Sequence, residues 1–190
     1  MKKKNILTIG IVTILILMIP LVAMQFTDEV NWSVFDFIIM GGLLFGTGIV
    51  YEFISGRSKD VLFKIAAGIG VISGLLLIWI NLSVGIIGSE GNPANLLYAG
   101  VIFTGIVGAL MVRFHSGGMA RTLFITAFLQ ALVPMIALIF WKDAFNEPPG
   151  FGGIFLLNSV FAVFFAISGF LFLRADNGNL KGKKPVTQTQ

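Results

Sequence analysis

The chain has 190 residues, 56% of them hydrophobic and only 12% charged, with a formal net charge of +4. Soluble domains carry about 25% charged residues, so this chain cannot cover a water-facing surface, and a lipid bilayer is its natural solvent. The absence of cysteine excludes disulfides and a catalytic thiol, and the single histidine, His115, excludes metal or haem sites built on two histidines of one chain. We expect no cofactor and no nucleic acid partner, since the basic residues flank apolar segments instead of forming a phosphate-binding face.

Six apolar segments follow one another along the chain, each close to or above the roughly 20 residues that a membrane-spanning helix needs. The connections between them are too short to fold as soluble domains. The sequence therefore predicts an all-α fold, a polytopic transmembrane bundle of six helices in which residues 1–174 form one domain. Residues 175–190 are polar, lack apolar periodicity and are predicted to form a disordered cytoplasmic tail. The six predicted helices are Ile6–Met24, Phe35–Ser55, Val61–Gly88, Leu96–Arg113, Thr122–Trp141 and Ile154–Leu173.

The orientation of the helices follows from lysine and arginine, which collect on the cytoplasmic side of a membrane protein. With the N-terminus inside, Lys142 is the only one of the 13 basic residues that falls outside. An even number of helices returns the chain to the same side, so both termini are predicted to be cytoplasmic. Arg113 and Arg121 also fall on that side, where we expect them to contact anionic lipid head groups.

The first apolar segment has a second interpretation. Its lysine-rich start, its apolar run and Ala23 are also features of a cleaved signal peptide. The run is long, however, and the large neighbours of Ala23 make a poor cleavage site, so the sequence favours an uncleaved helix. Cleavage near Met24 would leave five helices.

Polar residues gather near the predicted outer ends of the helices. Amides and carboxylates in such a place could line an outward-facing pocket for a cation or a polar head group. Capping is the competing explanation, because Asn92-Pro93 is typical of a turn, Asn95 could cap the fourth helix and Asp36 could cap the second. The candidate ligand-binding residues are Asp36, Asn81, Ser83, Glu90, Asn92, Asn95 and Asn158.

Gln130 is the strongest polar group near the middle of any predicted helix. Pro134 follows four residues later and cannot donate a hydrogen bond to the Gln130 carbonyl. The two residues could line a small polar cavity at the membrane midplane, or Gln130 could instead bond a neighbouring helix. No charged residue or histidine occupies the central stretch of a predicted helix, which argues against proton- or sodium-driven transport.

The connection between the third and fourth helices combines apolar and polar residues. Val61–Gly88 has 28 residues where about 20 suffice, and a straight span that starts near Lys64 would end near Ser83. Val84–Gly88 is therefore either a tilted extension of the helix or an apolar segment folded back over the outer face. Its two glycines permit both.

The run from Trp79 to Tyr98, with Gly118-Met-Ala-Arg121 downstream, resembles a group of small, uncharacterised bacterial multi-pass inner-membrane proteins. The likeness covers most of the chain from Ile19 to the sixth helix. It implies a bacterial cytoplasmic (inner) membrane as the location and implies no reaction.

Three functions are compatible with these residues. The favoured one is a non-enzymatic membrane protein that acts through lipids, a protein partner or a second copy of itself, because no catalytic set and no midplane charge is found. The first alternative is a small transporter or channel for a neutral or weakly polar solute, which would use Gln130, Pro134 and the asparagines near the outer ends of the helices. The second is a lipid-modifying intramembrane enzyme with Glu90 or Asp36 as its base, although both carboxylates lie at exposed helix ends.

Overall fold

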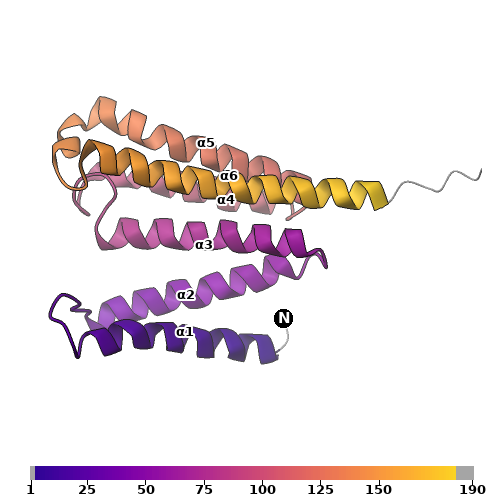
Figure 1. The fold of residues 1–190 in the computed structure, drawn as a ribbon, viewed down its shortest axis with the longest axis horizontal. Helices are drawn as coiled ribbons and strands as arrows, with labels where there is room; N and C mark the ends of the chain where they lie inside the picture. The colour runs from indigo at the N-terminus through magenta and orange to yellow at the C-terminus, as the bar shows by residue number, and fades with distance from the viewer. Residues whose placement is uncertain (1–2, 183–190) are drawn as a thin grey trace, which may run out of the picture. The chain divides into compact units, whose positions relative to one another are not determined.

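Six long helices and two short 3-10 turns form the computed structural model, which describes residues 3–182 (Figure 1). Within these residues there is no strand, and the predicted all-α architecture of six helices is confirmed. Each helix is long and apolar enough to cross a membrane, the fourth together with the turn before it. The elements are α1 (Lys3–Ala23), α2 (Val34–Ser55), α3 (Val61–Ser83), η1 (Pro93–Leu96), α4 (Leu97–Met111), α5 (Ser116–Phe140), η2 (Lys142–Asn146) and α6 (Gly150–Gly182).

The helices group into two compact units, Met1–Gly56 and Arg57–Gln190. In the first unit α1 and α2 pack against each other. The Ile9 side chain lies against Gly48, where an added Cβ would come within 2.5 Å of the Ile9 Cγ2 atom. Asn5 Nδ2 donates a hydrogen bond to Glu52 Oε1 near one end of this hairpin. A small residue and a polar pair thus join two helices whose other side chains are mostly hydrocarbon.

In the second unit α6 packs against both α3 and α5, and α4 packs against α5. Small residues allow this close approach. The Ser168 hydroxyl donates a 2.7 Å hydrogen bond to the Ala66 carbonyl, and a Cβ added to Gly70 would lie 2.9 Å from the same hydroxyl oxygen. Gly108 faces Thr122 even more closely. Because α3 is held mainly by α6 and α4 mainly by α5, the sides of α3 and α4 that face each other are only sparsely filled.

The two largest differences from the predicted helix boundaries lie at the start of α5 and at the end of α6. Helix α5 begins at Ser116, so Arg121 lies on a helix and not in a loop. Helix α6 continues through Gly182, whereas a disordered tail was predicted from residue 175. The side chain of Ala175 is completely buried, so the first turn past the predicted end still packs against other residues. The remainder of the predicted tail lies outside the described residues.

Candidate functional site

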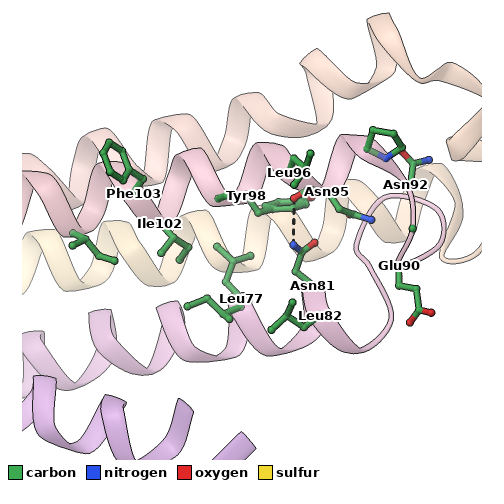
Figure 2. Close-up of a pocket in the computed structure, with 15 residues that line it drawn as sticks. Leu77, Asn81, Leu82, Glu90, Asn92, Asn95, Leu96, Tyr98, Ile102 and Phe103 are labelled. Atoms are coloured by element: carbon green, nitrogen blue, oxygen red, sulfur yellow. Dashed lines mark hydrogen bonds between the residues drawn. The ribbon is translucent and has the colours of Figure 1, made fainter. Parts of the chain in front are cut away.

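A groove of about 740 Å³ lies between α3 and α4, where α3 ends and α4 begins (Figure 2). Most of its lining is apolar, with Leu77, Ile78 and Leu82 on α3 and with Ala99, Ile102, Phe103 and Ile106 on α4. Polar side chains collect at the end next to the α3–α4 loop. Four of the seven residues predicted to form a pocket therefore share one groove, namely Asn81, Glu90, Asn92 and Asn95.

The loop at this end contains Val84–Gly88, the apolar segment that follows α3. It folds back and does not extend the helix, which was one of the two predicted alternatives. The α3 helix ends at Ser83, and the backbone turns at Gly85 and Gly88, whose φ angles are +70° and +64°. Ile86 and Ile87 between them are completely buried. Two apolar side chains thus anchor the loop to the second unit, and two glycines supply the backbone conformations that this requires.

Asn95 holds the folded segment in place with a single side chain. Its Oδ1 accepts hydrogen bonds from the Ile86 and Ile87 amides at 3.1 and 3.0 Å. Its Nδ2 donates to the Ile87 and Ser89 carbonyls at 3.3 and 2.8 Å. Asn95 is 95% buried, and three of these four bonds, those to Ile86 and Ile87, are buried, so they satisfy backbone groups that water does not reach. Its primary role is therefore to fix the loop, not to contact a ligand.

Replacing Gly85 by alanine should destabilise this loop. A Cβ at Gly85 would lie 2.7 Å from the Ser89 carbonyl oxygen and 2.8 Å from Asn95 Nδ2, at a φ of +70°. We expect the free energy of unfolding to fall by roughly 1–3 kcal/mol, measured by thermal and SDS-induced unfolding in mixed micelles. The matched control is Gly91→Ala, because an added Cβ there meets nothing within 4 Å. Equal stability of the two variants would contradict the prediction.

Asn81 is the polar residue that α3 places on the wall of the groove. Its Nδ2 donates a 3.2 Å hydrogen bond to the Asn95 carbonyl, drawn as the dashed line in Figure 2. Its Oδ1 is buried and has no hydrogen-bond partner among the described residues. A buried acceptor in this condition is costly in apolar surroundings.

Glu90 and Asn92 lie at the rim of the groove. Asn92 Oδ1 accepts a 2.9 Å hydrogen bond from the Ala94 amide and caps η1, which begins at Pro93. The competing prediction of a turn at Asn92-Pro93 is thereby confirmed. The Glu90 side chain is exposed, and Figure 2 shows it extending from the loop. Glu90 is the carboxylate among the residues that line the groove.

Two other predicted residues lie elsewhere. Asp36 belongs to the first unit, where it forms a capping box with Ser33 at the start of α2, as the competing prediction proposed. The Ser33 amide and hydroxyl each donate a 2.7 Å hydrogen bond to Asp36 Oδ2. Ser83 is the exposed last residue of α3 and does not line the groove.

Asn158, the seventh predicted residue, is buried on α6 behind the groove. Its Oδ1 accepts hydrogen bonds from the Tyr98 hydroxyl at 3.1 Å and from Gln130 Nε2 at 3.0 Å. Its Nδ2 donates to the Ile154 carbonyl at 2.8 Å and lies 3.0 Å from the Tyr98 hydroxyl oxygen. Three helices, α4, α5 and α6, are thus joined by one buried polar cluster consisting of Tyr98, Gln130 and Asn158.

Tyr98 is the functional candidate that the sequence did not reveal. It lines the groove, and its hydroxyl enters the polar cluster, although only 1% of the residue is exposed. The signal in the sequence is weak, because its partner Asn158 lies 60 residues away. A tyrosine within an apolar helix does imply a buried partner for its hydroxyl, but it does not say which one.

Gln130 and Pro134 are both completely buried and do not line the groove. Gln130 bonds a neighbouring helix through Asn158, which was one of its two predicted roles. Its Oε1 has no partner among the described residues. Gln130 is therefore bonded to Asn158, Asn158 is bonded to Tyr98, and Tyr98 lines the groove.

The groove offers apolar walls and a few polar groups at one end. The described residues contain no group of three His, Cys, Asp or Glu side chains that could share a metal ion. The six apolar helices support assignment to the class of multi-pass membrane proteins. No family model, curated protein or solved structure matches the chain. The function is therefore argued from the groove itself.

Proposed function

We propose that this chain is a non-enzymatic multi-pass protein of a bacterial inner membrane that binds a membrane lipid in the groove between α3 and α4. The six apolar helices, the cytoplasmic bias of the basic residues and the resemblance of the sequence support this location. In that orientation the polar end of the groove faces the outer surface.

The amphipathic lining of the groove is the observation that carries the proposal. Leu77, Ile102 and Phe103 offer a hydrocarbon surface, and Asn81 and Glu90 lie at one end only. A phospholipid has the same division, with an apolar chain attached to one polar head. Ligand sites of proteins generally combine an apolar lining with a few polar groups that fix the orientation of the ligand.

The length of the groove also fits one acyl chain. The wall from Asn95 to Ile106 covers roughly 16 Å at 1.5 Å per helical residue. One leaflet occupies about 15 Å, half of the hydrocarbon thickness of a bilayer. A lipid whose head lies beside Asn81 would therefore extend its chain along α4 as far as the membrane midplane.

Filling the groove should remove the bound lipid. Ala99 is exposed on its wall, so Ala99→Trp places an indole in the space that the acyl chain would occupy. After purification with extensive detergent washing, native mass spectrometry of the wild-type protein should show one retained phospholipid. We expect Ala99→Trp to lose most of that adduct.

The matched control is Ala131→Trp, because Ala131 is an exposed alanine on α5 that does not line the groove. This variant should retain lipid as the wild type does, and thermal unfolding should show that both variants fold. A wild-type protein without a phospholipid adduct, or equal retention by the two variants, would refute lipid binding in the groove.

A further inference from the structure

We infer that the protein also binds an anionic phospholipid at the end of the second unit where α3 begins and α4 ends, with Arg57 and Arg113 at the lipid phosphate. Arg57 precedes α3, and Arg113 follows α4. The polar end of the groove lies where α3 ends and α4 begins, so the two lipid sites belong to opposite membrane surfaces. This second site is independent of the groove.

A cation–π contact joins the loop before α3 to the loop after α4. The Arg57 guanidinium carbon lies 5.4 Å from the centroid of the Phe114 ring. Phe114 follows Arg113 directly in the chain, so the contact brings Arg57 to the loop that carries Arg113. Stacking on an aromatic ring fixes the plane of a guanidinium group and leaves its positive charge in place. Two loops that each carry an arginine are thereby held together at one place.

The loop after α4 is held in one conformation by its own hydrogen bonds. The Arg113 amide donates to the Leu110 carbonyl at 3.0 Å, and the Phe114 amide donates to the Ala109 carbonyl at 3.2 Å. Arg113 and Phe114 have φ angles of +50° and +61°, which residues with a side chain rarely adopt. A loop that is already ordered loses little conformational entropy when it binds a ligand, so its arginine is well suited to a binding site.

Basic side chains outnumber acidic ones around this contact. The two loops and the helical turns next to them, residues 56–64 and 112–121, contain one acidic residue, Asp60, which caps α3. Asp176 of α6 borders them, since its Oδ2 lies 2.8 Å from the point where a Cβ on Gly117 would stand. Five exposed basic residues against these two carboxylates favour an anionic ligand. The basic residues are Arg57, Lys59, Lys64, Arg113 and Arg121.

The apolar residues beside this basic area favour a lipid as the anion. Arg57 precedes the span that begins at Val61, and Arg113 follows the span that ends at Met111. Both arginines therefore lie at the level of the lipid head groups, which extend about 5–7 Å beyond the hydrocarbon core on each side. Leu110 and Met111 are 58% and 77% exposed and offer hydrocarbon surface next to the arginines. A free phosphate would use the charge alone, whereas a phospholipid uses both.

The experiment starts from full-length protein washed in detergent, because a lipid on this exposed area exchanges with detergent. Phosphatidylglycerol or phosphatidylcholine with identical acyl chains is then added, and native mass spectrometry measures the adducts that the protein gains. We expect the wild-type protein to bind phosphatidylglycerol in preference to phosphatidylcholine. The double variant Arg57→Gln/Arg113→Gln should bind phosphatidylglycerol roughly 30-fold more weakly, as the loss of two basic residues at a membrane surface implies.

The matched control is Lys3→Gln/Lys4→Gln, which removes the same charge from two exposed residues of the first unit. This variant should bind phosphatidylglycerol as the wild type does. Equal losses in the two double variants would overturn the inference, because total charge and not a site would then be responsible. Thermal unfolding shows whether each variant folds. Arg113→Gln alone changes one exposed residue, and it should weaken binding roughly fivefold.

Two further comparisons separate this site from a soluble-anion site and from the groove. Excess inorganic phosphate should displace no more phosphatidylglycerol than sodium chloride at equal ionic strength, and greater displacement would overturn the assignment to a lipid. Ala99→Trp, which fills the groove, should gain phosphatidylglycerol as the wild type does. A wild-type protein without preference for phosphatidylglycerol would refute this second site and leave the lipid-binding groove standing.

Discussion

Replacing Asn95 by alanine should lower the free energy of unfolding by roughly 3–5 kcal/mol, because buried unsatisfied backbone groups cost about 1–3 kcal/mol each. The variant leaves the amides of Ile86 and Ile87 and the carbonyls of Ile87 and Ser89 without their partner. SDS-induced unfolding in mixed micelles measures the loss. Limited proteolysis should show cleavage between Val84 and Asn92 in the variant alone.

Asn92→Ala is the control for this experiment. Asn92 is also a loop asparagine, but its side chain caps η1 through one hydrogen bond to the Ala94 amide. Loss of such a cap costs about 1 kcal/mol, so the two alanine variants should differ several-fold in their effect. If Asn95→Ala were as mild as Asn92→Ala, the folded loop would not depend on the bonds of Asn95.

Replacing Asn158 by leucine should be the second severe change, with an expected loss of about 2–4 kcal/mol. Leucine has a similar size, but it leaves the Tyr98 hydroxyl and Gln130 Nε2 without their common acceptor. All three residues are at least 99% buried, so water cannot easily replace the lost partner. The free energy of unfolding in mixed micelles is again the measurement.

Gln130→Leu provides the contrast, with an expected loss below about 1 kcal/mol. It removes one hydrogen bond but also removes Gln130 Oε1, an acceptor that has no partner among the described residues. Asn158 Oδ1 still accepts from the Tyr98 hydroxyl in this variant. A loss for Gln130→Leu equal to that for Asn158→Leu would show that the cluster is centred on Gln130 instead.

The sequence predicted those features that depend on neighbouring residues. Hydrocarbon runs of sufficient length predicted six helices, and the count from Lys64 correctly indicated an α3 end near Ser83. The same local reasoning explains why capping by Asp36 and the turn at Asn92-Pro93 were among its alternatives. Each of these two caps depends on residues that are two or three positions apart in the chain, so they are close together without any tertiary contact.

The remaining features depend on which helices pack together, and apolar periodicity alone does not determine that. The partnership of Tyr98 with Asn158 spans 60 residues. Asp36 and Asn81 were grouped by depth, and they belong to different units. Ala175 is buried beyond the predicted end of α6, which a polar stretch of sequence does not indicate.

The short 3-10 turn η1 has a consequence for the match between the protein and the bilayer. Leu97–Met111 alone covers roughly 22 Å, whereas the hydrocarbon core is about 30 Å thick. The four residues of η1 add about 8 Å, so that Pro93–Met111 together span the core. Unwinding of this one turn would leave a span that lipids accommodate by thinning the membrane. The Asn92 cap that holds η1 therefore also sets the hydrophobic length of the fourth span.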